Sequence, residues 1–331
     1  MTFAVVGNDA GGAELLCTFA AKYADQAQWH LFCEASSPMA AVAAKRGFAT
    51  TAPDDIERAF DTIAPDALLF GTGWQERYER PFVAYAKSRG IPTFAFLDHW
   101  SKYRERFGYP DAGWEANLPD FTAVHDEKAL ALAGELGLPH PVALPNLYLQ
   151  EIVDAAQEQP VHSTLLFFGE PTDRVAKAHY GDENYWGFTQ YTALEAIFEN
   201  FGRFGCESLS IRLHPSESAA GYRKVLKKFP SVRVRINDAH TFDLTDQIMQ
   251  AKVVIGFDTM ALYIAAHLNK PVISYLPSSS REFLLPLPAS HQIRNLSQVK
   301  PALLQPLHLE CGKFGMDFAS FSQLIRDFRS L

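Results

Sequence analysis

The run from Val253 to Tyr275 constrains the fold of this chain more than any other stretch. It opens with three β-branched residues, which are typical of a strand buried on both faces. The turn Gly256-Phe257-Asp258-Thr259 follows, and either of its last two residues can cap the helix expected over 260–267. A second strand is expected over 272–275. In such a unit the free N–H groups of the helix's first turn face the carboxyl edge of a parallel sheet, where an anion can bind.

A second strand with a polar end lies about forty residues upstream. Leu209 to Leu213 predicts a strand, and His214-Pro215 ends it because proline cannot continue the ladder of hydrogen bonds. The histidine is thereby left at the carboxyl edge of the sheet, where open α/β folds bind ligands. No GxxxxGK[ST] run occurs, so neither turn is a P-loop. Two edges suited to phosphate favour a nucleotide ester as the ligand.

Length and charge limit the classes of function. The chain has 331 residues, 47% of them hydrophobic, which is enough for two domains with cores of their own. Its formal net charge is −8, so a general electrostatic footprint for nucleic acid is absent. Anionic ligands must then be bound by helix termini and individual basic residues. The histidines lack metal-ligand spacing and no DxD run occurs, so no metal is expected.

The cysteines and the apolar runs predict a cytoplasmic protein. The four cysteines form no CxxC pair and do not suggest a disulfide framework; they are Cys17, Cys33, Cys206 and Cys311. The first apolar run is interrupted at Gly7-Asn8-Asp9, unlike a signal peptide, and no stretch reaches the length of a membrane span. Peripheral contact with the inner face of a membrane stays open, because an acceptor can be lipid-linked.

Strands and helices alternate along both halves of the chain, which predicts an α/β fold with parallel sheets covered on both faces. We expect two Rossmann-like domains facing each other across a cleft. The polar segment 150–163 is the expected linker. The expected domains are residues 1–155 and 156–315, and the last helix, within 316–331, is expected to pack back on the first domain.

Leu213-His214-Pro215 and the later turn Gly256-Phe257-Asp258-Thr259 together resemble the nucleotide-binding domain of GT-B glycosyltransferases. The similarity is greatest to bacterial transferases that use CMP-activated sialic acid, other nonulosonic acids or Kdo. The resemblance implies that His214 contacts the CMP phosphate and that Thr259 holds the same phosphate, with Asp258 nearby. It also implies a metal-independent, inverting enzyme without a cofactor. The turn here is Asp-Thr, where the family has Ser-Ser or Ser-Thr.

The expected donor-binding residues lie in turns that follow the strands of the second half. In GT-B enzymes the loop matching Gly169-Glu170-Pro171-Thr172 approaches the donor, and the loop after Tyr275 lies near the ribose, although both also read as ordinary turns. The complete set is Gly169, Glu170, Thr172, His214, Pro215, Ser216, Asp258, Thr259, Met260, Ser278 and Ser279.

A transfer needs a base that takes the proton of the acceptor hydroxyl. Asp9 follows the first strand in a glycine-rich turn and is the first candidate, although capping a helix is an equal alternative for it. Asp98-His99 is the second candidate, because a carboxylate that orients an imidazole gives a base near neutral pH. His214 completes the expected catalytic residues.

The expected acceptor contacts lie beside these candidates. Arg104 or Arg106 can pair with a carboxylate, and Trp100 or Tyr103 can stack on a sugar; a surface turn is the alternative. Glu14 is interpreted as a helix-dipole partner or an acceptor contact. The full acceptor set is Gly11, Gly12, Glu14, Trp100, Tyr103 and Arg104.

The sequence therefore favours a glycosyltransferase that moves a nonulosonic acid or Kdo from a CMP-sugar to a glycan or glycolipid acceptor, in the synthesis of a surface polysaccharide. Three alternatives stay open. One is a UDP-sugar transferase or UDP-sugar 2-epimerase, although the few acidic residues around His214 argue against the epimerase. The others are a transferase of polyol phosphate from a CDP donor, and a nucleotide-binding partner protein without catalytic activity.

Overall fold

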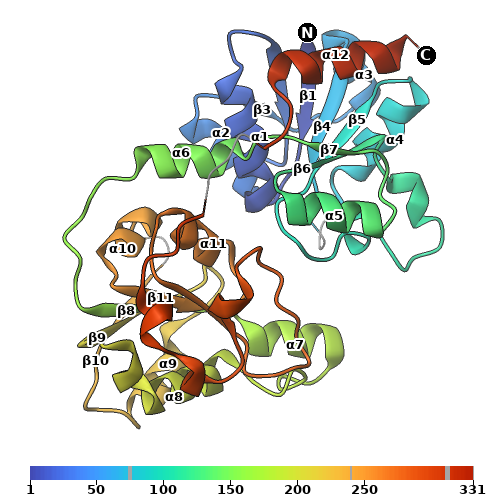
Figure 1. The fold of residues 1–331 in the computed structure, drawn as a ribbon. Helices are drawn as coiled ribbons and strands as arrows, with labels where there is room; N and C mark the ends of the chain where they lie inside the picture. The colour runs from blue at the N-terminus through green and yellow to red at the C-terminus, as the bar shows by residue number, and fades with distance from the viewer. Residues whose placement is uncertain (74–76, 239–240, 310–313, 331) are drawn as a thin grey trace. The chain divides into compact units, whose positions relative to one another are not determined.

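A computed structural model describes residues 1–73, 77–238, 241–309 and 314–330 of the chain (Figure 1). The chain divides into two compact units. Unit 1 comprises Met1–Gln150 and Gly312–Leu331, and unit 2 comprises Glu151–Cys311. The terminal segment 316–331, for which we expected a place on the first domain, falls within unit 1.

Unit 1 is built on a seven-stranded sheet in which every pair of neighbouring strands is parallel. The spatial order is β3-β2-β1-β4-β5-β6-β7. The strands are β1 (Thr2–Val6), β2 (Gln28–Phe32), β3 (Thr50–Thr51), β4 (Ala67–Gly71), β5 (Thr93–Phe96), β6 (Phe121–Val124) and β7 (Pro141–Ala143). The central strands are continuous apolar runs because helices cover both of their faces.

The helices of unit 1 alternate with these strands. They are α1 (Ala10–Lys22), α2 (Pro38–Lys45), α3 (Ile56–Ile63), α4 (Arg80–Ser88), α5 (Glu127–Glu135), α6 (Leu147–Ala155) and α12 (Phe318–Arg329). Helix α6 crosses the division between the units, so the first part of the expected linker is helical. The helix extends into the expected linker because it begins before it, where Leu147 and Leu149 are buried. Apolar packing of this first turn stabilises the helix into the segment that follows.

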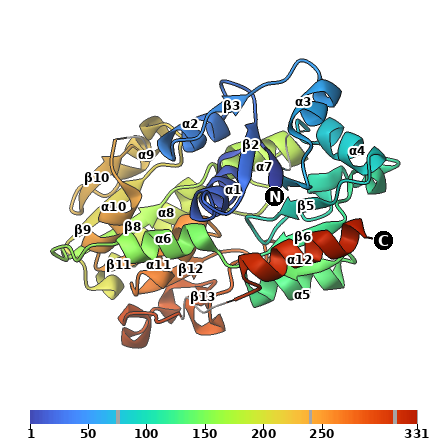
Figure 2. The same cartoon turned by 90° about the horizontal axis from the view of Figure 1, so that it is seen from above.

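Helix α12 packs on the core of unit 1, next to strands that lie far away in the sequence (Figure 2). Phe321 is fully buried, and its ring lies 4.9 Å from that of Phe94 and 6.3 Å from that of Phe3. Phe318 stacks on Tyr23 at 4.3 Å. The last helix therefore supplies aromatic core to the first sheet, and aromatic pairs add stability beyond the area that they bury.

Unit 2 is built on a six-stranded parallel sheet in the order β10-β9-β8-β11-β12-β13. Its strands are β8 (Thr164–Phe168), β9 (Ser208–Arg212), β10 (Arg233–Asn237), β11 (Val253–Gly256), β12 (Val272–Tyr275) and β13 (Gln292–Ile293). Its helices are α7 (Thr172–Tyr180), α8 (Gln190–Glu199), α9 (Ala219–Leu226), α10 (Leu244–Gln250) and α11 (Met260–His267).

The strands β9 and β11 differ in how they are covered. All four residues of β11 are buried, whereas β9 alternates buried with partly exposed residues. Leu209 and Ile211 enter the core of unit 2, and Ser208 and Ser210 point to the opposite face. One face of the sheet is therefore polar at its β9–β10 side.

The predicted α/β class is confirmed, with two parallel sheets and helices between the strands. The unit over 253–275 is also confirmed, including the helix that starts at Met260. The short strands β3, β7 and β13 were not predicted, because two or three residues are too few to show a periodic pattern.

Two further features concern the environment of the chain. No helix within the described residues is long and apolar enough to cross a membrane. Cys17, Cys33 and Cys206 are free thiols, and Cys311 lies outside the described residues.

We expect Phe321→Ala to destabilise unit 1 by about 3–5 kcal/mol, because it removes a fully buried ring from a packed aromatic core. Urea unfolding followed by tryptophan fluorescence and circular dichroism measures the change. Gln323→Ala on the exposed side of the same helix is the matched control and should shift stability by about 0.5 kcal/mol or less. Equal effects of the two changes would show that α12 does not stabilise the sheet.

Candidate functional site

Three turns of unit 2 meet at one edge of its sheet. They follow the neighbouring strands β9, β8 and β11, and they carry His214, Gly169-Glu170 and Asp258-Thr259 respectively. Because the strands are parallel, their carboxyl ends share an edge. The structure therefore brings together the main donor-binding residues that the sequence predicts.

The ring of His214 is held in place by contacts with the turn that follows it. The ring Nδ1 accepts the backbone N–H of Ser216 at 3.2 Å and lies 2.9 Å from the Ser216 hydroxyl. This pattern assigns the proton to Nε2 in the neutral ring. Desolvation lowers the pKa of His214, and the charge of Glu170 opposes that effect. At neutral pH the ring is thus a neutral Nε2–H donor, and its side chain stays accessible from solvent.

Glu217 fixes the backbone of the same turn, and the sequence analysis did not find it. Its carboxylate accepts the N–H of His214 at 3.0 Å and the hydroxyl of Tyr222 at 2.8 Å. Burial raises the pKa of Glu217. A Cβ atom on Gly169 would lie 2.4 Å from the Tyr222 hydroxyl and 2.6 Å from the Glu217 carboxylate. The glycine is therefore required for this close approach, and only the His-x-x-Glu spacing could have indicated Glu217.

A charged network spans the turns after β8 and β11. Glu170 accepts the backbone N–H of Asp258 at 3.1 Å and pairs with Arg281 at 3.2 Å. Arg281 also lies 3.7 Å from the carboxylate of Asp258, which is only 3% exposed, and its guanidinium packs 5.3 Å from the ring centre of Trp186. The Glu170 carboxylate therefore already accepts a hydrogen bond from a backbone N–H close to the start of α11.

The helix α11 is capped by Thr259, whose hydroxyl accepts the N–H of Ala261 at 3.4 Å. Asp258 has a different role, since its carboxylate accepts the N–H of Leu284 at 3.1 Å. The sequence left the choice of cap between these two residues open. Met260 begins the helix and is partly exposed.

Other predicted donor residues have structural contacts. Thr172 is buried, and its hydroxyl bonds the side-chain oxygen of Gln190 at 2.9 Å. Ser278 lies 2.8 Å from the hydroxyl of Ser280, which is itself bonded to the backbone of Trp186. Pro215, Ser216 and Ser279 are exposed.

Asp9 and Asp98 both lie at the carboxyl edge of the sheet in unit 1, after strands β1 and β5. Asp9 caps α1 by accepting the N–H of Gly12 at 3.1 Å. Asp98 forms an ion pair of 2.7 Å with Arg106, which is 7% exposed and also bonds Thr72. A Cβ atom on Gly11 would lie 1.9 Å from the Asp98 carboxylate, so this glycine makes room for it.

His99 and its neighbours stabilise the loop after β5. The Nδ1 of His99 lies 3.0 Å from the Ser101 hydroxyl. Trp100 and Tyr103 are buried, and the indole N–H of Trp100 bonds Asp126 at 2.8 Å. Arg104 donates to the backbone carbonyl of Leu136. In this conformation the two buried rings support the loop and offer no face to a sugar that arrives from solvent.

Glu14 pairs with Arg46 at 3.2 Å, and both side chains are mostly covered.

Within the described ranges of the chain, no three His, Cys, Asp or Glu side chains are grouped so that they could hold a metal ion.

Sequence comparison identifies no relative: no protein-family model matches the chain, and no curated protein matches it. Solved structures do match. S. aureus MnaA in a co-structure with UDP is 12% identical with a TM-score of 0.60, over 98% of this chain and 95% of that one. The UDP-GlcNAc 2-epimerase of Neisseria meningitidis, bound to UDP-GlcNAc, is 12% identical with a TM-score of 0.59, over 100% and 93%. A glycosyltransferase of Rickettsia africae is 9% identical with a TM-score of 0.51, over 83% and 79%.

The chain has a GT-B fold. This architecture was expected from the His-Pro pair and the later strand–turn–helix. At these levels of identity the likeness shows the GT-B fold alone, so the roles of the individual side chains rest on the contacts described above.

We expect Gly11→Ala to destabilise unit 1 by about 1–3 kcal/mol, because the new methyl group would collide with the Asp98 carboxylate that Arg106 holds in place. Gly134→Ala in α5 is the matched control. Nothing lies within 4 Å of its added Cβ, so it should be neutral or stabilise by up to about 1 kcal/mol. Urea unfolding of the two variants measures the difference, and equal stability would contradict the close packing of Gly11 on Asp98.

Proposed function

We propose that the chain is a metal-independent glycosyltransferase that binds a UDP-sugar at the carboxyl edge of the sheet in unit 2. The observation that carries the proposal is the meeting of His214, Glu170 and the start of α11 at three adjacent strand ends. Such an edge offers uncharged N–H donors to an anion without being strongly basic. This suits the phosphates of a nucleotide-sugar in a chain of net charge −8.

The leaving phosphate would be stabilised by fixed donors. The Nε2–H of His214 and the amino terminus of α11, whose Ala261 N–H is already capped by Thr259, would face the phosphate as negative charge grows on it, and preorganised donors of this kind lower the barrier. Because its pKa is lowered, His214 is a neutral donor at pH 7 and does not have to lose a proton before it binds. Glu217 acts indirectly, by holding the backbone of the turn.

The nucleotide is proposed from the structural neighbours. The S. aureus and N. meningitidis structures are described with UDP and UDP-GlcNAc, whereas the CMP donor favoured by the sequence has no support from them. We therefore place a UDP-sugar first and keep a CMP-sugar as the alternative to be tested.

Candidates for the acceptor's base lie in unit 1. Asp9 has one carboxylate oxygen in the cap of α1, and His99 is half-buried beside Ser101. Asp98 is held by Arg106 and is better suited to a positioning role. We propose Asp9 or His99 as the base, with a glycan or glycolipid as acceptor.

A UDP-sugar 2-epimerase is the second candidate, because the N. meningitidis enzyme matches over the whole of this chain. The two activities differ in what happens at C2 of the sugar. An epimerase removes the proton on C2 of the sugar, so UDP-GlcNAc incubated in D₂O would gain deuterium at C2. A transferase leaves this proton in place, and NMR of the recovered sugar distinguishes them.

We expect wild type to bind UDP more tightly than CMP by calorimetry, equally with magnesium and with EDTA. His214→Ala should weaken UDP binding by roughly tenfold or more, which is the scale of a hydrogen bond to a charged group. His308→Ala, an exposed histidine of the same unit, is the matched control and should bind as wild type. Tighter binding of CMP than of UDP would favour a CMP-sugar as the donor. The absence of any nucleotide binding would contradict the proposal.

Glu170→Gln should strengthen UDP binding by roughly threefold to tenfold. The Glu170 carboxylate accepts the N–H of Asp258 and pairs with the guanidinium of Arg281, two groups that could otherwise bind a phosphate. Its negative charge also repels the phosphate. The amide can still accept the N–H of Asp258 but carries no charge. Glu199→Gln on α8 is the exposed control. Weaker binding of Glu170→Gln would instead mean that Glu170 itself accepts a hydrogen bond from the nucleotide.

A further inference from the structure

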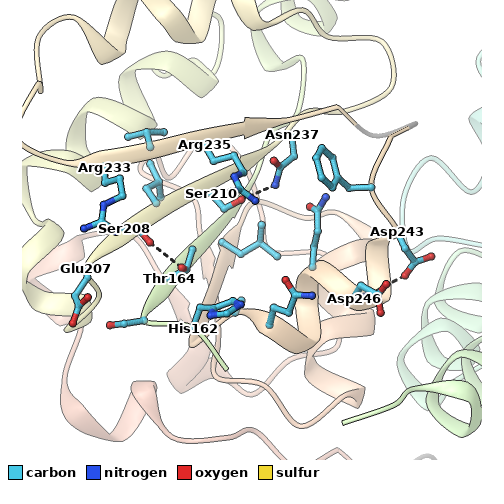
Figure 3. Close-up of a pocket in the computed structure, with 18 of the residues that line it drawn as sticks. His162, Thr164, Glu207, Ser208, Ser210, Arg233, Arg235, Asn237, Asp243 and Asp246 are labelled. Atoms are coloured by element: carbon cyan, nitrogen blue, oxygen red, sulfur yellow. Dashed lines mark hydrogen bonds between the residues drawn. The ribbon is translucent and has the colours of Figure 1, made fainter. Parts of the chain in front are cut away.

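A cavity lies on a face of the sheet in unit 2 (Figure 3). It has a volume of about 930 Å³ and is bordered by β8, β9, β10, α10 and the loop before α10. None of the residues assigned above to nucleotide binding lines it. A volume of this size is typical of a site for a small molecule or for part of a chain ligand.

The cavity exists because this face of the sheet carries small side chains. Thr164, Ser208 and Ser210 form its floor, and the large apolar residues of β9 point to the opposite face. Helix α10 contacts β8 and α11 and is only seven residues long. The polar floor over β9 and β10 is therefore left accessible beside this helix.

Two amide side chains at the cavity have buried atoms without a hydrogen-bond partner among the described residues. Asn237 is 4% exposed; its amide nitrogen donates to Ser210 at 2.8 Å, but its oxygen has no partner in the part of the chain that the structure describes. Both amide atoms of Gln247 are also buried without a partner in the described chain. Buried polar atoms are nearly always bonded, because an unmade bond costs free energy. A ligand that both donates and accepts hydrogen bonds could satisfy these atoms.

Charged side chains of both signs line the cavity. Arg233 and Arg235 are exposed on the edge strand β10 and form no ion pair within the described residues. Carboxylates line the same cavity, at Glu207, Asp243 and Asp246. A polyanion such as nucleic acid would be repelled by these carboxylates, and an apolar peptide would lose hydrogen bonds against the hydroxyl floor.

We propose that this cavity is a binding site for an oligosaccharide. Sugar hydroxyls both donate and accept hydrogen bonds, which suits the Asn237 oxygen and the amide group of Gln247, for which the described residues supply no partner. Guanidinium and carboxylate groups can each form two parallel hydrogen bonds, which matches neighbouring hydroxyls on a sugar ring. Phe242 is 42% exposed at the cavity and offers an apolar face to the C–H groups of a sugar.

This site goes beyond the proposed function and does not depend on it. If the chain transfers sugars to a glycan, the cavity holds units of that glycan apart from the donor phosphate. If it does not, the cavity still binds saccharide. The two proposals therefore fail separately, one in a nucleotide titration and the other in a saccharide titration.

The test uses the full chain and four hexasaccharides, built from glucose, N-acetylglucosamine, galacturonic acid and sialic acid. Saturation-transfer NMR and calorimetry measure binding. We expect at least one of them to bind, and Ser210→Trp, which fills the cavity, to weaken that binding at least tenfold. Gln247→Leu is a milder second variant, in case the tryptophan disturbs folding, and should weaken it several-fold. Both variants should bind UDP as wild type does.

Arg223→Ala on α9 is the matched control for Arg235→Ala. Its helix packs with Leu209 and Ile211, on the face of the sheet opposite the cavity. We expect only Arg235→Ala to weaken saccharide binding. The proposal is overturned if no hexasaccharide of the panel binds, or if binding survives both Ser210→Trp and Gln247→Leu. Competition by UDP for the saccharide would also overturn it, since that would place both ligands in one site.

Discussion

The buried carboxyl group of Asp258 is the constraint on which the edge of the sheet in unit 2 depends. A carboxyl group that is 3% exposed needs polar partners, and the Arg281 guanidinium lies 3.7 Å away. The same guanidinium holds Glu170, which in turn binds the backbone N–H of Asp258. One arginine therefore ties the turns after β8 and β11 to the loop after β12, at the edge where we propose that an anion binds.

The sequence predicted the architecture well because the signals were local. The β-branched strand, the turn and the helix over 253–275 each follow from neighbouring residues, and His214-Pro215 marks a strand end by itself. The partners of these groups could not be predicted in the same way. Arg281 and Glu217 act through contacts that depend on how separate turns meet, and no spacing along the chain encodes such meetings.

The same limit explains the residues of unit 1. The sequence predicts that Asp98 and His99 form a catalytic pair. In the structure the Asp98 carboxylate instead forms an ion pair with Arg106 and packs closely on Gly11. Trp100 and Tyr103 read as a sugar-stacking loop and are buried. Aromatic residues satisfy a core and a binding surface equally well, so sequence alone cannot assign them. Only burial decides, and burial is a property of the complete fold.

The two proposed sites of unit 2 follow from one property of a parallel sheet. Its carboxyl edge collects turns and helix starts, which suit an anion. Its faces normally collect apolar side chains, yet Ser208 and Ser210 replace them over β9, and the short α10 leaves that face accessible. Because Ser208 and Ser210 add little apolar core on this face, Leu209 and Ile211 on the opposite side must hold β9 in place. An accessible polar face with unpartnered amides is costly for stability alone, which is why a ligand is the better explanation for it.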